Sequence, residues 1–418
     1  MKKICFFFST TDFTGAGKMG LEYAKAFRDA GYEVFAICGE RIDAPTPSIV
    51  NYLIQEKIEV IEERGFTKLL DIFLILRCAI ILKKRKPSAV ISMFQMDVKI
   101  AGWAAFLAGV PLILSAQNRV KFYGNIFLQR MKDRFFGVTL RKTARLAICT
   151  SEAVEKELWE HYRFDRTRIV YNGIDTKTFS DFPTSERKKS REALGVSDSE
   201  KMFLNIGRLD EQKGQDILLR AWKEALNRMQ SAKQNLENKS TNMPSLYPSG
   251  FPLKAGMTSA DFGMKLFLAG GVTPHSKASE AYADRLRRLV EELGIERSVY
   301  FLGWRDDICE LLRACDCYVH SALWEGWPLT VLEAMASNVP VIMTDCVERM
   351  KDFENERDGF VVPSGEVEPL ARAIDRVSEM HIEDRSRMGQ CAQKIIREHY
   401  EIAHLKRAFI EEVETVCG

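Results

Sequence analysis

The sequence lacks the patterns that mark disulfide frameworks, metal sites and membrane spans. Its ten cysteines form no C-x-x-C pair and no zinc-like spacing, which is typical of reduced thiols in the cytosol. The longest apolar helical segment, residues 69–82, contains Asp71 and Arg77, and a bilayer span needs roughly 20 apolar residues. The apolar run at the start of the chain is too short for a secretory signal. We therefore expect a cytoplasmic protein in which residues 69–82 form a buried or interfacial helix.

Charge is unevenly distributed along the chain. Residues 1–180 contain 28 Lys and Arg against 19 Asp and Glu, whereas the remainder contains 32 against 39. The basic excess is concentrated in residues 119–145, where eight basic residues and several aromatic and aliphatic ones accompany Asp133 alone. Two interpretations stay open. The first is a surface that meets anionic lipid at the inner face of the membrane or an acidic acceptor, and the second is a solvated helix–loop region with some core-facing aromatics. No recognition motif accompanies the patch, so nucleic acid is not an expected partner.

Short apolar runs alternate with helical stretches in two separate series. The first series begins with KICFFFS and the second with KMFLNIGR near residue 201. Such alternation predicts an α/β fold with two doubly wound, Rossmann-like parallel-sheet domains. We place the domains at residues 1–185 and 196–395, with the charged stretch 181–195 as the boundary. Residues 227–263, rich in Asn, Ser, Pro and Gly, are expected to form a flexible surface insertion.

A glycine motif follows the first apolar run. Gly15, Gly17 and Gly20 spell G-x-G-x-x-G, and Glu40 lies twenty residues further on, which is the pattern of an NAD(P)-binding oxidoreductase. However, six residues separate the expected strand from Gly15, and the dinucleotide fingerprint requires a tight turn there. The two remaining interpretations are an anion-binding turn at a helix start and a glycine-rich turn without a ligand.

The second series carries charged residues just after its strands. Arg208 and Lys213 flank a turn that opens a helix, where two cations are well placed for a phosphorylated ligand, although either could form a surface ion pair. Glu325 precedes Gly326 and Pro328 in a loop, and Glu333 follows on the next helix. A solvent-facing position is the ordinary expectation for each glutamate alone, but their spacing suggests that both address one cavity.

These segments together resemble the retaining glycosyltransferases of the GT-B superfamily, in the family-four (group 1) branch. The resemblance extends over nearly the whole chain, through TGAGKMG, CTSEAVEKEL, YNGID, NIGRLDEQKG, LFLAGG, the stretch from YFLGW to TVLEAMA, and DGFVVPSGEVEPLARAI. It implies two Rossmann-like domains with the nucleotide sugar in their cleft, and a C-terminal helix, residues 396–418, that returns to the first domain. The implied activity is a hexosyltransferase that uses a nucleoside-diphosphate sugar, with a UDP-sugar favoured and GDP-mannose next. The implied acceptor is a glycan or lipid-linked molecule in surface polysaccharide or glycolipid synthesis.

The resemblance also assigns roles to residues. Arg208 and Lys213 would neutralise the diphosphate leaving group, and Glu325 would complete the catalytic set. Donor binding would use a wider group: Gly15, Gly17, Arg208, Lys213, Glu325, Gly326, Trp327, Pro328, Leu329 and Glu333. Glu333 would accept hydrogen bonds from the ribose, so the two glutamates are not a glycosidase pair. No metal or other cofactor is expected, because cations and helix amides stabilise the leaving group.

One departure from the family concerns the acceptor side. Many members carry a histidine where this sequence has Gln117-Asn118, after PLILSA. Asp97 and Asn118 become the acceptor-side candidates, with ordinary polar loop residues as the alternative for each. The missing histidine also leaves room for a catalytically silent GT-B glycan-binding protein as an alternative function.

Overall fold

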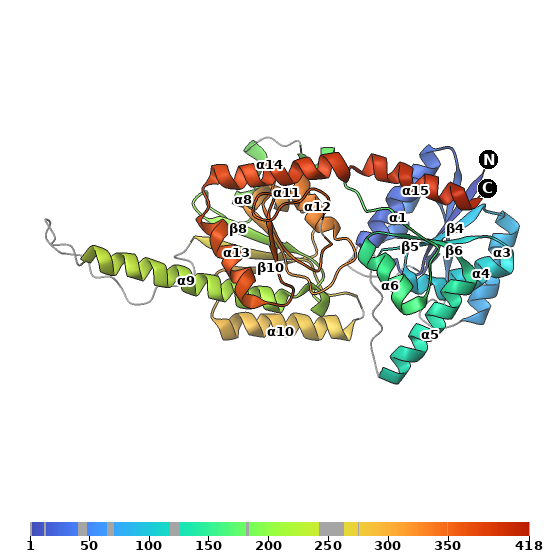
Figure 1. Ribbon diagram of the computed structural model, residues 1–418, viewed down its shortest axis with the longest axis horizontal. Coiled ribbons are helices and arrows are strands. Elements are labelled where there is room, and N and C mark those ends of the chain that lie inside the picture. Colours follow the sequence, from blue (N-terminus) through green and yellow to red (C-terminus); the bar gives the residue numbers. More distant parts are fainter. Residues whose placement is uncertain are drawn as a thin grey trace. The chain divides into compact units, whose positions relative to one another are not determined.

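The computed structural model describes most of the chain and divides it into two compact units. The described residues are 2–11, 14–40, 48–64, 71–117, 126–180, 184–241, 263–274, 276–348 and 350–417. Unit 1 comprises Met1–Gly173, Glu325–Leu329 and Tyr400–Gly418. Unit 2 comprises Ile174–Trp324 and Thr330–His399. Each unit is an α/β assembly around its own sheet (Figure 1), so the predicted fold class is confirmed.

The described strands of unit 1 form one parallel sheet in the order β3-β2-β1-β4-β5-β6-β7. They are β1 (Lys3–Phe8), β2 (Glu33–Gly39), β3 (Glu59–Glu63), β4 (Ala89–Ser92), β5 (Leu112–Ala116), β6 (Ala144–Cys149) and β7 (Thr167–Ile169). Residues 4–8 of β1 are all buried, because helices cover both faces of a parallel sheet and both side-chain directions therefore need apolar residues.

The helices of unit 1 cover the two faces of that sheet. They are α1 (Gly15–Asp29), α2 (Ile49–Gln55), α3 (Ile72–Arg85), α4 (Trp103–Ala108), α5 (Ile126–Thr143), α6 (Glu152–Tyr162) and α15 (Ile402–Cys417). Helices α3 to α6 share one apolar core with the sheet. Helices α1 and α15 contact each other, and Phe409 of α15 stacks on Tyr23 of α1 with ring centroids 3.8 Å apart. The C-terminal helix therefore belongs to unit 1, although the residues before it belong to unit 2.

Unit 2 contains a second parallel sheet, in the order β10-β9-β8-β11-β12-β13. Its described strands are β8 (Lys201–Ile206), β9 (Met264–Ala269), β10 (Val299–Gly303), β11 (Cys317–His320), β12 (Val341–Thr344) and β13 (Phe360–Val362). The helices are α7 (Thr176–Ser180), α8 (Thr184–Ala193), α9 (Gln215–Thr241), α10 (Lys277–Leu293), α11 (Ile308–Ala314), α12 (Leu329–Ala336), α13 (Val367–Glu379) and α14 (Ile382–His399). Helices α9, α10 and α13 share one core, centred on the buried Trp222.

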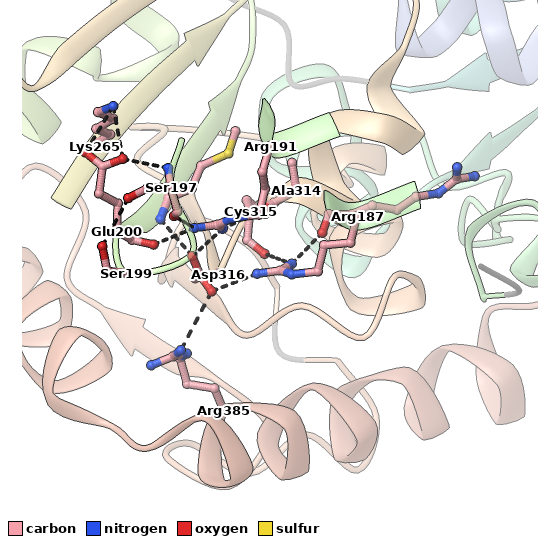
Figure 2. Close-up of polar contacts among 12 residues, drawn as sticks. Arg187, Arg191, Ser197, Ser199, Glu200, Lys265, Ala314, Cys315, Asp316 and Arg385 are labelled. Carbon is pink, nitrogen blue, oxygen red and sulfur yellow. Dashed lines mark hydrogen bonds and ion pairs between the residues drawn. The ribbon is translucent and has the colours of Figure 1, made fainter. Parts of the chain in front are cut away.

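The division between the units falls at Gly173, earlier than the predicted boundary in 181–195. Helix α8, inside that stretch, is held in unit 2 by two arginines (Figure 2). Arg187 donates to Asp316 Oδ1 at 2.8 Å, and Arg191 donates to Asp316 Oδ2 at 3.0 Å. Arg385 of α14 lies 3.7 Å from the same carboxylate, and the backbone N–H of Met202 donates to it at 2.8 Å. The charged composition that suggested a linker instead supplies a buried ion-pair cluster.

Helix α9 also extends further than the sequence indicated. Residues 227–241, the first part of the expected insertion, continue the helix that starts at Gln215, and this part projects beyond the sheet of unit 2 (Figure 1). Most of these residues are good helix formers, so the helix persists where the apolar period stops. Residues 242–262 lie outside the described part of the chain.

Candidate functional site

Each sheet has one point at which the strand order reverses direction. In unit 1 it lies between β1 and β4, and in unit 2 between β8 and β11. Because the crossover helices leave such a point toward opposite faces, the carboxyl ends of the two strands border a crevice where open α/β sheets bind ligands. Most of the predicted site residues follow one of these four strands.

Arg208 lies directly beyond the end of β8 and is half-buried. Its Nη2 atom donates to Gln212 Oε1 at 3.2 Å and lies 3.2 Å from Asp210 Oδ2. The carbonyl oxygen of Arg208 accepts a hydrogen bond from Gln215 Nε2 at 2.9 Å. The Arg208 guanidinium therefore has a counter-charge in Asp210, which agrees with the ion-pair alternative that the sequence left open for this residue. Gln215 also holds the backbone of Arg208 in place.

Lys213 lies in the same turn, and glycines allow the turn to pack closely. A Cβ atom at residue 207 would come within 3.3 Å of Lys213 Cγ and Cδ, so the lysine stem lies over the backbone at Gly207. Gly214 has φ +60°, and a Cβ there would approach Ser321 O to 2.2 Å. Ser321 Oγ in turn donates to Lys213 O at 2.9 Å. The loop after β8 is thus pressed against the loop after β11.

Gln212 joins these two loops and was missed by the sequence analysis. Its backbone carbonyl accepts from Leu323 N at 2.7 Å, and its side-chain Nε2 donates to Trp324 O at 2.9 Å. Gln212 therefore connects Arg208 to the residue that immediately precedes Glu325. Its position between Arg208 and Lys213 in RLDEQKG could have indicated a role in the site. Its contact with Trp324 could not be predicted, because the two residues are 112 positions apart in the chain.

Glu325 and Glu333 are both buried in their respective units, at 5% exposure each. Glu325 belongs to the loop segment grouped with unit 1, and Glu333 lies on α12 in unit 2. The ordinary solvent-facing position considered for each glutamate is wrong. Buried carboxylates are retained where other groups compensate them, which favours a specific role over a surface position.

Trp327 anchors the loop segment 325–329 within unit 1. Its Nε1–H donates to Asn172 O at 3.1 Å, and its ring centroid lies 4.6 Å from that of Tyr171 and 5.3 Å from that of Tyr400. The indole is buried in this aromatic group. Within the predicted donor-binding set, Trp327 thus orders the backbone from Gly326 to Leu329 through packing.

The glycine motif of the first strand serves packing as well as turn formation. Strand β1 ends at Phe8 and α1 begins at Gly15, so six residues separate the strand from the first glycine. A Cβ at Gly20 would approach Phe8 Cε1 to 2.5 Å, and one at Gly15 would lie 3.6 Å from Leu329 Cδ1. Gly15 therefore lies beside the loop segment 325–329, while Gly17 is buried in the first turn of α1.

Glu40, the acidic residue of the dinucleotide pattern, follows β2. Its carboxylate forms an exposed ion pair with Arg64 at 2.9 Å. Together with the six-residue gap before Gly15, this arrangement offers little support for the dinucleotide interpretation.

Asp97 is a fully buried carboxyl group on the β4 side of the unit 1 reversal point. It ends a short 3₁₀ turn, Gln95–Asp97, and a π-helical turn, Val98–Gly102, follows at once. Neither carboxyl oxygen accepts a hydrogen bond of close geometry from a described residue, although Ser9 and the Phe94 N–H are potential donors nearby. Burial raises the pKa of Asp97 to about 7, against the opposing effects of nearby Ser9, Phe94 N–H and Lys99. Irregular π turns recur at functional sites.

Gln117, where many family members carry histidine, is fully engaged in unit 1. Its Nε2 donates to Ser115 Oγ at 2.7 Å, and its Oε1 accepts from Asn172 Nδ2 at 2.9 Å. The backbone carbonyl of Asn172 also accepts a hydrogen bond from the Trp327 indole, so Gln117 is linked to that loop segment through Asn172. Asn118 lies outside the described residues.

The structure divides the predicted residues between the two units. Arg208, Lys213 and Glu333 belong to unit 2, whereas Gly15, Gly17, Asp97 and the segment Glu325–Leu329 belong to unit 1. Across the described ranges, no cluster of three or more His, Cys, Asp or Glu side chains is placed to hold a metal ion. The described part of the chain likewise has no helix of the length and apolarity needed to cross a membrane.

Two family models match the chain, one in each half. Glycosyltransferase Family 4 matches residues 13–178, and Glycosyl transferases group 1 matches residues 260–395. Together with the two doubly wound domains of the GT-B type, these matches show that the chain belongs to the group 1, family-four glycosyltransferases.

Individual relatives are distant. An uncharacterised glycosyltransferase of Methanocaldococcus jannaschii is 26% identical over 70% of this chain and 65% of its own length. The UDP-Gal:alpha-D-GlcNAc-diphosphoundecaprenol alpha-1,3-galactosyltransferase of Escherichia coli is 24% identical over 72% of this chain and 68% of its own. The matches therefore span about two thirds of these relatives. The crystal structure of HepE from Anabaena with UDP and glucose covers 99% of this chain and 100% of its own, with a TM-score of 0.78 and 21% identity.

Proposed function

We propose that this protein is a retaining glycosyltransferase that moves a hexose from a nucleoside-diphosphate sugar to a glycan or lipid-linked acceptor. A UDP-sugar is the favoured donor and GDP-mannose the next. The observation that carries the proposal is the pair of cations, Arg208 and Lys213, at the carboxyl end of β8, joined through Gln212 to the loop that leads to Glu325.

The chemistry requires stabilisation of the departing diphosphate. Negative charge develops on the phosphate as the sugar becomes oxocarbenium-like, and preorganised cations act strongly on such charge because they need no reorganisation. Arg208 and Lys213 supply positive charge, and the backbone between Gly326 and Leu329 supplies amide donors. In this proposal Glu325 holds the sugar and Glu333 accepts hydrogen bonds from the ribose, with no metal ion needed.

Retention of configuration follows from attack on the same face of the sugar, with the leaving phosphate accepting the acceptor proton. Asp97 has the properties of an acceptor-side group, because it is fully buried beside the reversal point of unit 1 and burial raises its pKa to about 7. It can therefore exchange a proton near neutral pH while it positions an acceptor hydroxyl.

The relatives support this choice of substrates. HepE was crystallised with UDP and glucose, and the name of the E. coli relative specifies UDP-galactose and a diphosphoundecaprenol acceptor. A lipid-linked acceptor agrees with a peripheral protein at the inner face of the membrane. On α5 the exposed side chains of Arg130, Arg134 and Lys142 provide cations for that contact, whereas Phe136 is buried in the core.

Donor hydrolysis and binding measured across UDP-, GDP- and ADP-sugars test the function. We expect the sugar nucleotides of one base to bind and to be hydrolysed, and Lys213→Ala to lower the hydrolysis rate by a factor on the order of 10²–10³. Arg220→Ala, an exposed change on α9, is the matched control and should behave as wild type. Tight NADH binding without nucleotide-sugar binding would instead support the oxidoreductase alternative. Sugar-nucleotide or glycan binding without turnover on any acceptor would support a silent binding protein.

The contribution of α5 is tested by sedimentation with vesicles. Neutralising Arg130, Arg134 and Lys142 should weaken binding to anionic vesicles at low salt, because exposed charges act through a screened interaction. Arg141 is left unchanged, since it donates a hydrogen bond to Tyr162 O and its loss would disturb the packing of α5. Salt-insensitive binding that the variant retains would reject a role for these cations.

A further inference from the structure

Helix α3 presents an apolar face to the outside of unit 1. Ile72, Phe73 and Ile80 are 62%, 76% and 65% exposed, and Leu76 between them is also exposed. The opposite face of α3, including Leu74, Cys78 and Leu82, is buried in the core. An ordinary surface helix has a polar outer face, so four exposed apolar side chains on the outer face of α3 are unusual.

The neighbouring helix enlarges this face. Phe106 and Leu107 of α4 are exposed, and α4 contacts α3 while packing on the same side of the sheet (Figure 1). Of the eleven large apolar side chains that are exposed in the described part of the chain, six lie on these two helices. Such clustering marks an interaction surface, whereas single exposed apolar residues are ordinary.

The unpaired exposed charges at the C-terminal end of this face are positive. Residues 72–86 contain no Asp or Glu, and the exposed face of α3 ends in Lys83 and Lys84. Arg77 pairs with Glu63 at 2.8 Å, and Arg85 pairs with Glu59. Neither Lys83 nor Lys84 forms an ion pair with a described residue. A second copy packed on the same face would bring no carboxylate from α3 to these lysines, whereas anionic lipid headgroups would.

We propose that the outer face of α3, together with Phe106 and Leu107 of α4, docks on an anionic lipid bilayer. Ile72, Phe73, Leu76 and Ile80 enter the boundary between headgroups and acyl chains, and Lys83 and Lys84 contact the headgroups. This surface is separate from the cations of α5, and it does not depend on the donor chemistry. It assigns an interfacial role to residues 72–82, the part of the apolar segment 69–82 that α3 contains, which the sequence left as either buried or interfacial.

The test measures binding of the full-length protein to vesicles of phosphatidylcholine with 30 mol% phosphatidylglycerol. The double variant Phe73→Glu/Ile80→Glu should bind at least tenfold more weakly than wild type, and at high salt as well, because the burial of apolar surface is not screened. Both sites are exposed, so the fold should be retained, and thermal melting checks this. The matched control is Ile54→Glu on α2, another exposed apolar residue of unit 1, which should bind within twofold of wild type.

A second variant separates the charge contribution from the apolar one. Lys83→Glu/Lys84→Glu should reduce the preference for phosphatidylglycerol over pure phosphatidylcholine vesicles. The proposal is overturned if wild type fails to bind the anionic vesicles, or if Phe73→Glu/Ile80→Glu binds them as wild type does. A wild-type dimer that this variant converts to monomer, with vesicle binding unchanged, would assign the face to a second copy instead. Donor hydrolysis in solution should be the same in all these variants, so failure of the docking proposal is distinct from failure of the proposed function.

Discussion

Asp97 in unit 1 and Asp316 in unit 2 are both buried, yet their surroundings are opposite. Asp316 precedes β11 and interacts with three arginines and a backbone N–H, whereas Asp97 follows β4 and has only Ser9, the Phe94 N–H and Lys99 nearby to oppose the effect of burial. Strands β4 and β11 occupy equivalent places in the two sheets, beside the point where strand order reverses. The carboxylate before its strand is fully compensated, as a structural ion pair must be. The carboxyl group after its strand, at the edge where ligands bind, is only partly compensated, because burial outweighs these neighbours.

This comparison separates stability from function. A paired buried charge contributes by holding elements together, and here it holds α8 and α14 to the sheet of unit 2 (Figure 2). An unpaired buried carboxyl group lowers stability when it ionises, so its retention favours a role in binding or catalysis. The following predictions test each side of the contrast.

The largest effect is expected for Asp316→Ala. The change leaves Arg191 and Arg385 buried without their counter-charge, which should cost about 3–5 kcal/mol of unfolding free energy. Urea denaturation measures the loss, and Arg313→Ala on the neighbouring α11, whose ion pairs are with more exposed glutamates, gives a comparison. A loss below about 1 kcal/mol would show that Asp316 is not the structural member of the pair.

Lys213→Ala should reduce the rate constant of sugar transfer by a factor on the order of 10²–10³, equivalent to roughly 2.7–4 kcal/mol of transition-state stabilisation. The stem of Lys213 lies over the backbone at Gly207, beyond the last residue of β8, so truncating this side chain to alanine leaves the residues of the sheet unchanged. Steady-state kinetics with the active donor measures the change. Unfolding free energy close to that of wild type would confirm that the effect is on chemistry, and an unchanged rate would remove Lys213 from the catalytic set.

Asp97→Asn should change how stability depends on pH. Because the folded pKa of about 7 lies above the unfolded value near 3.8, the native state binds more protons between these values, and wild-type stability falls as pH rises through this window. Between pH 5 and pH 8 the wild type should lose about 2–3 kcal/mol more than Asp97→Asn. Urea denaturation at the two pH values checks this, and equal losses in both proteins would contradict the burial of an ionisable Asp97.

The smallest effect is expected for Arg187→Ala. Arg187 shares Asp316 with Arg191, but its side chain is 36% exposed against 5% for Arg191, so water replaces much of the lost interaction. We expect a loss of about 1 kcal/mol or less, compared with several for Arg191→Ala. Urea denaturation of both variants compares the loss of unfolding free energy at the exposed partner, Arg187, with the loss at the buried partner, Arg191. Equal losses would mean that the cluster is uniformly solvated.

The sequence predicted both sheets because buried parallel strands read as continuous apolar runs, as in β1 and β8. It also placed Arg208 and Lys213 at a strand end, which is a local property of the chain. The sequence did not predict features that depend on contacts between residues far apart in the chain. Helix α8 belongs to unit 2 because of Asp316, 125 residues beyond Arg191, and Gln212 matters through its contact with Trp324. The burial of Asp97 and Glu333 likewise depends on packing that no local pattern records.

Calorimetric titration of the nucleoside diphosphates UDP and GDP measures the central claim directly, namely that the cations after β8 bind the diphosphate. Wild type should bind one of the two, Arg208→Ala/Lys213→Ala should bind it at least 100-fold more weakly, and Asp97→Asn should bind it as wild type does. Unchanged diphosphate affinity in the Arg208→Ala/Lys213→Ala protein would contradict the account.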